Sequence, residues 1–176
     1  MGERVQRAIQ RFVFRAPVDR LLAEETVDLR MRMEPPAARG RALQVDIKRG
    51  TGGIVDIEFI AQFGVLRWGR KHRELRRTST RRILSQLMAM QYLDDREGRF
   101  LLDAYERLRG IEKCMRISSE QAPNVLPRGR DLELLARAAG RREPGELEEE
   151  VRTLMHETRG IFTRTIGHFA RREGRP

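Results

Sequence analysis

The sequence predicts an all-α protein, a bundle of six or seven helices joined by short antiparallel connections. Apolar residues recur at three- and four-residue steps in most segments, which is the period of an amphipathic helix. No strand-rich region and no internal repeat is visible. Of the 176 residues, 39% are hydrophobic and 35% are charged, which suits helices with one apolar stripe and wide solvated faces.

Residues 1–34 are expected to hold two N-terminal helices of a single domain that spans residues 1–176. The first covers residues 4–14. The second begins at Pro17, which fits the first turn of a helix, and is ended by the Pro35-Pro36 pair. Its apolar side, expected to face the core, consists of Val18, Leu21, Leu22, Val27, Leu29 and Met33.

A loop and a glycine turn over residues 35–52 lead into the main bundle, which occupies residues 53–172. Residues 43–48 alternate in polarity and predict a short extended arm within this loop. The helix predicted over residues 53–70 is apolar on nearly every side, so we expect it to be buried at the centre of the bundle.

Four further helices complete the predicted bundle. The candidate N-caps of the first two are small polar side chains, Thr78 or Ser79 and Asp94 or Asp95. The third helix, over residues 131–139, is closed by Gly140. The last helix runs from Pro144 to about Arg171, and its acidic first turns suit the positive end of the helix dipole.

The chain is strongly basic, with a formal net charge of +10. Only three of its 36 basic residues are lysine, Lys48, Lys71 and Lys113. This charge suits a nucleic-acid or acidic-protein surface, and the alternative is a genomic preference for arginine codons. Acidic residues are interspersed among the arginines and aromatic residues are not, so no base-stacking platform is evident and a nucleic-acid partner is not favoured.

Several function classes find no support in the sequence. No apolar run of 18 residues is free of charge, so we expect no membrane partner, and the N-terminus lacks the apolar core of a signal peptide. The single cysteine, Cys114, fits a cytoplasmic protein without an internal disulfide. The three scattered histidines and one cysteine have no metal-ligand spacing, so no metal site is predicted.

The segment from Asp46 to Trp68 carries the strongest functional signal. A polar extended piece runs into a turn with three glycines, where positive φ angles and close approach of other groups are allowed. An almost wholly apolar stretch follows. Its polar residues need partners if they are buried, and they are Asp56, Glu58 and Gln62.

The pattern Lys-x-x-x-Gly-Gly-Ile-x-Asp-Ile-Glu-Phe-Ile-x-Gln, from Lys48 to Gln62, resembles the segment that follows the catalytic module in glutamine synthetase adenylyltransferase. A looser form occurs in the PII uridylyltransferases. The resemblance covers roughly residues 10–165 and continues through Glu74-Leu75-Arg76-Arg77-Thr78-Ser79-Thr80, Ala104-Tyr105-x-x-Leu108-Arg109 and Asn124-Val125-Leu126-Pro127. The chain departs from the family at Val55, where the family often has arginine, and this removes one possible phosphate or carboxylate contact.

The resemblance implies a helical domain next to a nucleotidyltransferase module. Together with a chain end soon after the last helix, the motif resembles the second half of that enzyme. This half transfers AMP from ATP to a tyrosine of glutamine synthetase, and the first half removes it. ATP and Mg²⁺ are then cofactors of the full-length enzyme rather than of this chain. The implied partners are the nucleotidyltransferase module, glutamine synthetase and a PII protein.

The catalytic carboxylates of the family are missing from this chain. The family module binds Mg²⁺ and the nucleotide phosphates through an Asp-x-Asp pair, and this sequence contains none. The most similar sequence here is Asp56-Ile57-Glu58. If this segment is helical, its two acids lie about 200° apart around the helix and cannot bind one metal ion together. We therefore predict no catalytic residue here and no turnover by the isolated chain.

Lys48 is the foremost candidate for contact with nucleotide phosphates. The structural alternative is a salt bridge from Lys48 to Asp56 or Glu58 that fixes the turn. Gly52 and Gly53 could present backbone N–H groups to an anion at the start of a helix, and the alternative is close packing of two chain segments.

The other polar residues in apolar surroundings are expected to form a structural network rather than a catalytic one. For the acids, the preferred interpretation is buried ion pairing with nearby arginines. The predicted network consists of Asp56, Glu58, Gln62, Tyr105, Arg109 and Glu112.

A dense basic segment follows the central helix. It could dock an acidic partner surface, and the alternative is a solvated loop; its partner-binding candidates are Arg70, Lys71, Arg73, Arg76 and Arg77. Two rival functions remain open, a basic nucleic-acid-binding helical module and a purely structural scaffold domain. A steep salt dependence of nucleic-acid affinity would identify the first rival.

Overall fold

The computed structural model of the protein describes residues 5, 12–14, 18–35, 44–118, 124–167 and 169–170, and this part of the chain is an all-α bundle. Six α-helices are found in it, which confirms the predicted fold class. They are α2 (Arg20–Arg32), α3 (Ile54–Trp68), α4 (Thr80–Ala89), α5 (Asp95–Ser118), α6 (Arg130–Ala138) and α7 (Pro144–Phe162). Most of the helix predicted over residues 4–14 lies outside the described residues.

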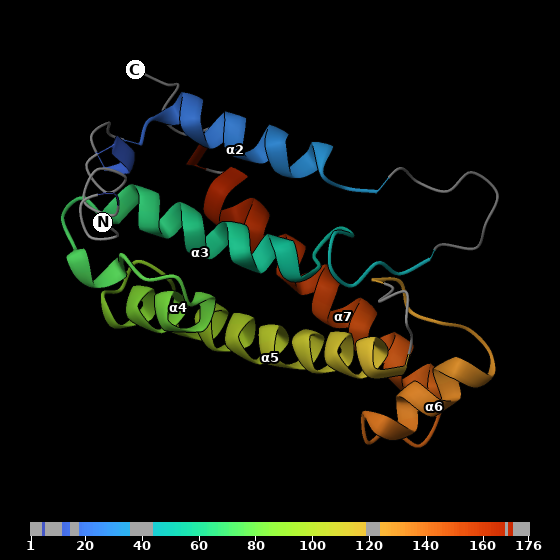
Figure 1. The fold of residues 1–176 in the computed structure, drawn as a ribbon. Coiled ribbons are helices and arrows are strands. Elements are labelled where there is room, and N and C mark those ends of the chain that lie inside the picture. The colour runs from blue at the N-terminus through green and yellow to red at the C-terminus, as the bar shows by residue number, and fades with distance from the viewer. Residues whose placement is uncertain are drawn as a thin grey trace.

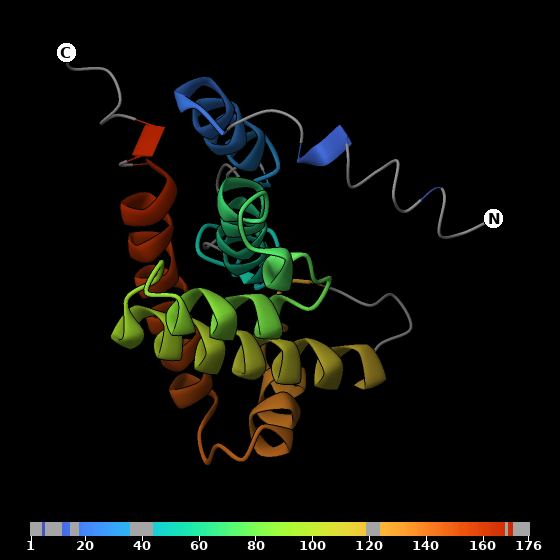
Figure 2. The ribbon, with the colours of Figure 1, turned by 90° about the vertical axis from the view of Figure 1, so that its left-hand side faces the viewer.

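Helix α3 lies at the centre and contacts α2, α4, α5 and α7. Figure 1 shows α2 on one side of α3 and the paired helices α4 and α5 on the other, while α7 crosses behind α3. Figure 2 shows the same three layers from the end, with α6 beyond α5. Each layer places one apolar face against α3 or α5, and a common core results.

The sequence pattern explains this arrangement. Helix α3 is apolar on most sides, and Ile54, Ile57 and Ile60 are at most 1% exposed. On α5 the residues at three- and four-residue steps are buried, namely Leu101, Ala104, Leu108, Ile111 and Met115. Burying one large aliphatic side chain stabilises a fold by about 1.5–3 kcal/mol, so these two helices supply much of the driving force.

Helix starts follow the capping rules in three places. The side chain of Asp19 accepts a hydrogen bond from the Leu22 N–H, and that of Ser79 accepts one from the Arg82 N–H. Asp94 Oδ1 accepts from the N–H groups of Arg96 and Glu97 at 2.9 and 3.1 Å. These contacts satisfy donors that the first turn of a helix cannot satisfy itself.

The expectation for the apolar side of α2 was wrong in part, since Val18 and Val27 pack against the core but three other members are exposed. Leu21, Leu29 and Met33 are 61%, 50% and 38% exposed, whereas the buried residues of α2 are Ala23 and Arg30. The helix is rotated so that an arginine faces the core, because a buried acid of α3 lies there. The last helix changes its type before the predicted end, since α7 stops at Phe162, a π-helix follows over Thr163–Gly167, and residues 169–170 are again α-helical.

The predicted extended arm is reduced to one isolated antiparallel bridge between Asp46 and Val125. Flanking hydrogen bonds run from Ile47 N–H to the Asn124 carbonyl and from Leu126 N–H to the Val45 carbonyl, both at 2.9 Å. They tie the glycine turn to the segment between α5 and α6. Within the described ranges, every helix is too short or too polar to cross a membrane.

Candidate functional site

The turn from Asp46 to Gly53 is held by its own polar groups. Asp46 Oδ1 accepts from the N–H groups of Lys48 and Arg49 at 2.9 and 2.7 Å, and the Asp46 carbonyl accepts from Gly50 N–H at 3.0 Å. The carbonyl of Lys48 in turn accepts from Val55 N–H at 3.0 Å, in the first turn of α3. The backbone of Lys48 is therefore fixed on both sides.

The two glycines before α3 are required by close packing. Gly52 has φ +77°, and a Cβ atom there would lie 1.7 Å from the carbonyl oxygen of Met155 in α7. A Cβ on Gly53 would lie 2.7 Å from the Ile47 carbonyl oxygen. Neither residue can carry a side chain without moving backbone.

The N–H groups of these glycines are already used. Gly52 N–H donates to Asp56 Oδ2 at 3.0 Å, and Gly53 N–H donates to the Gly50 carbonyl at 2.9 Å. Neither donor is left free for a phosphate, so the geometry favours close packing over an anion site at Gly52 and Gly53.

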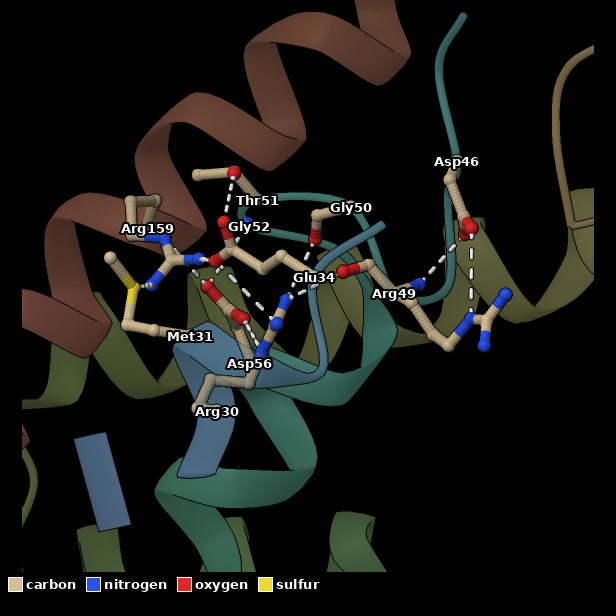
Figure 3. Close-up of polar contacts among 10 residues, drawn as sticks. All are labelled: Arg30, Met31, Glu34, Asp46, Arg49, Gly50, Thr51, Gly52, Asp56 and Arg159. Atoms are coloured by element: carbon tan, nitrogen blue, oxygen red, sulfur yellow. Dashed lines mark hydrogen bonds and ion pairs between the residues drawn. The ribbon is translucent and has the colours of Figure 1, made fainter. Parts of the chain in front are cut away.

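Asp56 is the centre of a buried ion-pair network (Figure 3). Its side chain has no exposed surface, and its Oδ1 accepts a hydrogen bond from Nε of Arg30, which is also fully buried. Its Oδ2 lies 3.1 Å from Nε of Arg159 in α7. Asp56 thus joins α2, α3 and α7 at one point.

Arg30 extends this network to the glycine turn. One of its terminal nitrogens donates to the carbonyl oxygens of Arg49 and Gly50 at 3.0 and 2.8 Å. Glu34 pairs with Arg159 and accepts from the hydroxyl of Thr51 at 3.0 Å. Figure 3 shows these side chains converging beneath the turn. The turn is therefore held from below by a side chain of α2 and by one that lies two residues beyond its end.

Two arginines and two acids balance in this network, and burial shifts their protonation. Burial raises the pKa of Asp56 to about 6, although the charge and hydrogen bond of Arg30 oppose the shift. Burial and the positive charge of Arg30 lower the pKa of Arg159 to about 10. Both oxygens of Asp56 have protein partners, so we infer a structural role for this carboxylate.

Glu58 faces a different helix from Asp56. The hydroxyl of Tyr105 in α5 lies 3.5 Å from Glu58 Oε1, whereas Asp56 contacts α2 and α7. The two acids are therefore splayed, as expected for neighbours two apart on a helix. Across the described ranges, no group of three or more His, Cys, Asp or Glu residues could hold a metal ion. Gln62, one turn further along α3, is exposed.

A second charged group surrounds Glu112 of α5, whose side chain is 4% exposed. Glu112 Oε1 lies 3.3 Å from Nζ of Lys48 and 3.2 Å from a terminal nitrogen of Arg116, and its Oε2 lies 2.5 Å from one of Arg109. We call Lys48, Arg109 and Arg116 the basic cluster. The salt-bridge alternative for Lys48 named the wrong acids, because the partner is Glu112 rather than Asp56 or Glu58.

The predicted network is thus divided between two sites. Tyr105, Arg109 and Glu112 lie along one stripe of α5, and the guanidinium of Arg109 is 5.9 Å from the ring centre of Tyr105. Asp56 belongs to the separate buried network on the other side of α3. Sequence reasoning missed Arg30, Arg159 and Arg116. Only Arg116 had a signal, its position four residues after Glu112 on the same stripe.

The basic segment after α3 is mostly exposed. Arg76 is the exception, because its Nε donates to the Gly69 carbonyl at 2.7 Å and its guanidinium lies 4.3 Å from the ring centre of Phe14. The exposed members are Arg70, Lys71, Arg73 and Arg77. Partner binding by these side chains stays a prediction.

Comparison with known proteins identifies the family. Residues 23–171 match the family model described as GlnD PII-uridylyltransferase. The chain is 34% identical over 127 residues to a protein of Thioalkalivibrio sulfidiphilus, which covers 72% of this chain and 13% of that protein. It is 31% identical over 128 residues to a protein of Xanthomonas campestris pv. campestris, covering 73% of this chain and 14% of that protein.

A third relative, from Methylococcus capsulatus, is 40% identical over 96 residues, or 54% of this chain and 10% of the relative. All three relatives are named bifunctional glutamine synthetase adenylyltransferase/adenylyl-removing enzyme. The matched family and these relatives therefore belong to the nucleotidyltransferase class. More particularly, the chain belongs to the family of the glutamine synthetase adenylyltransferases and PII uridylyltransferases. It spans only 10–14% of the length of these relatives.

Proposed function

We propose that this chain serves as the helical domain beside a nucleotidyltransferase module, in the half of a glutamine synthetase adenylyltransferase that transfers AMP from ATP to glutamine synthetase. The module that holds Mg²⁺ would lie outside these 176 residues. Membership of the family, and relatives that are several times longer, support this proposal. The proposed setting is the cytoplasm, with glutamine synthetase and a PII protein as partners.

The observation that carries the proposal is that Lys48 combines a partly exposed side chain with a fixed backbone. Its side chain remains 31% exposed, while its backbone is fixed by Asp46 and by the first turn of α3. The turn beneath it is held by Arg30. A cation on so rigid a support loses little conformational freedom when it meets a phosphate. Lys48 would therefore bind and orient a phosphate group that the neighbouring module positions.

The Mg²⁺ of the family does not fit the acids of the motif. Both oxygens of Asp56 are occupied by Arg30, Arg159 and Gly52. Glu58 points to α5 instead. We therefore assign no metal-dependent step to these residues. Their proposed part is to fix the turn and the helices around it.

A chimaeric enzyme tests the proposal. Residues 23–171 would replace the matching segment of the Thioalkalivibrio sulfidiphilus relative, and transfer of labelled AMP from ATP to glutamine synthetase would be measured. We expect the chimaera to transfer AMP and the isolated chain to transfer none. Lys48→Ala in the chimaera should slow transfer about tenfold or more, because a charge-assisted phosphate contact is lost.

The matched control is Lys113→Ala, which removes an exposed lysine from α5. We expect it to leave the rate unchanged. Equal rates for the Lys48 variant, the control and the parent chimaera would support the scaffold alternative instead. A chimaera that folds, as judged by circular dichroism, yet transfers no AMP would contradict the proposal.

A further inference from the structure

The charges around Glu112 do not balance, and this separates the basic cluster from the other ion-pair networks of the protein. In the network beneath the turn, Arg30 and Arg159 face Asp56 and Glu34. Arg107 and Arg141 both pair with Glu150, and Arg107 also pairs with Asp103. Two positive and two negative charges therefore balance in that network as well. Around Glu112 three cations share one carboxylate.

No second acid relieves this excess within the part of the chain that the structure describes. The neighbouring Asp46 lies 3.9 Å from Arg49 and caps the turn with its other oxygen, and Glu58 has Tyr105 as its polar neighbour. Each of these acids faces a partner other than the basic cluster. Among the residues that the structure describes, two positive charges therefore remain uncompensated at one place.

The cations of the basic cluster are positioned but still accessible. The side chains of Lys48, Arg109 and Arg116 are 31%, 46% and 52% exposed, whereas Glu112 between them is buried. Each uses one nitrogen on Glu112, and a guanidinium has five N–H donors and an ammonium three. Donors that can reach solvent are therefore left over on all three side chains.

We propose that Lys48, Arg109 and Arg116 form a binding site for an oligophosphate group, such as the triphosphate of a nucleotide, and that Glu112 is its positioning residue. Arginine forks and a lysine ammonium are the groups that bind phosphate oxygens best. The glycine turn and the C-terminal half of α5 lie at the same end of the bundle in Figure 1, so the site joins two segments that are remote in sequence.

This inference deepens the proposed function, because the site would add two arginines of α5 to the proposed phosphate contact of Lys48. Partly buried Tyr105 lies one turn from Arg109 on the same stripe and would offer an aromatic ring beside the phosphates. The proposed ligand is nonetheless any oligophosphate, with or without a base attached. Comparison of ATP with tripolyphosphate in the test below shows whether the base adds affinity.

The test is binding of sodium tripolyphosphate to the complete chain by isothermal titration calorimetry at low ionic strength and at 0.15 M salt. We expect Arg116→Gln and Arg109→Gln each to weaken binding about tenfold, the loss expected for one charge-assisted contact. The matched control is Arg99→Gln, since Arg99 is 72% exposed in an exposed pair with Asp95. It removes the same charge elsewhere, and we expect less than about a twofold change.

Circular dichroism would verify that each variant is folded. Equal weakening by the control and by Arg116→Gln would overturn the site, because it would show only a general attraction to a basic protein. Tighter binding of an acidic peptide than of tripolyphosphate would also overturn it. ATP binding as tightly as tripolyphosphate, with adenosine not competing, would support the phosphate assignment.

The titration with tripolyphosphate and the AMP-transfer test of the chimaera can fail independently of each other. Tripolyphosphate binding that responds to Arg109 and Arg116 would support the site even if the chimaera transferred no AMP, in which case the proposed function alone would fail. AMP transfer by the chimaera without any binding of tripolyphosphate to the complete chain would overturn the site alone.

Discussion

Arg30 and Asp56 form an ion pair in which neither side chain has any exposed surface. Removing two charges from water costs free energy, and their attraction repays this only when the other polar atoms are also satisfied. Arg30 meets that condition in part through the carbonyl groups of Arg49 and Gly50. The pair therefore fixes where α2 and the glycine turn lie relative to α3.

Removing one partner of this pair should be strongly destabilising. We expect Arg30→Met to lower the free energy of unfolding by about 3–5 kcal/mol, because Asp56 would keep a buried charge with less compensation. Urea unfolding followed by circular dichroism measures the change. The control on the same helix is Arg20→Met, whose exposed pair with Glu24 should be worth less than about 1 kcal/mol. Equal losses in the two variants would contradict the prediction.

Asp56 should titrate near pH 6. Its pKa in the folded protein, about 6, lies above the ordinary value of 3.8, so the folded state binds the proton more tightly than the unfolded state. The contribution of Asp56 is therefore largest below pH 3.8 and is lost as the pH rises through 6. The total change is about 3 kcal/mol. Carboxyl carbon NMR reports the pKa directly.

The variant Asp56→Asn isolates this effect from that of other acids. Its free energy of unfolding should lack the decline that Asp56 causes between pH 3.8 and 6 in the parent chain. Identical slopes for the two proteins in that window would show that Asp56 does not titrate there.

Substitution of Gly52 should cost more than its backbone conformation alone explains. Gly52→Ala is strained by φ +77° and also places a Cβ against the Met155 carbonyl, so we expect a loss of about 3 kcal/mol or more. Gly140 has a similar φ of +74° with nothing within 4 Å of the added Cβ, and Gly140→Ala should cost about 1 kcal/mol. Thermal unfolding of the two variants compares them. A loss for Gly52→Ala no greater than that for Gly140→Ala would contradict the packing explanation.

Neutralising Glu112 should destabilise the chain in a way that phosphate reverses. In Glu112→Gln the three cations of the basic cluster would repel one another, and we expect a loss of about 1–2 kcal/mol after allowance for their exposure. Tripolyphosphate should then raise the Tm of this variant more than that of the parent chain. The control is Glu106→Gln, which removes an acid from α5, as Glu112→Gln does, but breaks only an exposed pair with Arg81 of α4. An equal rise in both variants would count against the basic cluster.

Local patterns predicted the helical core well. The all-round apolar character of α3 and the stripe of α5 gave both their positions and their buried faces, because burial of apolar area is the largest favourable term and follows directly from residue type. The caps Ser79 and Asp94 were also predictable, since their side chains act on neighbouring N–H groups.

The orientation of α2 could not be predicted in the same way. Its apolar residues outnumber its buried ones, and Arg30 turns inward because of Asp56, which is 26 residues away in the sequence. Likewise the partner of Lys48 is Glu112, which follows it by more than 60 residues and reaches it only after α3 and α5 have packed together. Long-range pairs of charges leave no periodic signal in a sequence.

The carbonyl groups of Arg49 and Gly50 rest on Arg30, and Lys48 immediately precedes them. Suppose that a ligand binds Lys48 more tightly when α2 is docked on the bundle than when α2 is undocked. By thermodynamic linkage, binding of that ligand must then raise the free energy required to undock α2. Hydrogen exchange of the α2 amides would therefore become slower when the ligand binds, although α2 itself would not contact the ligand.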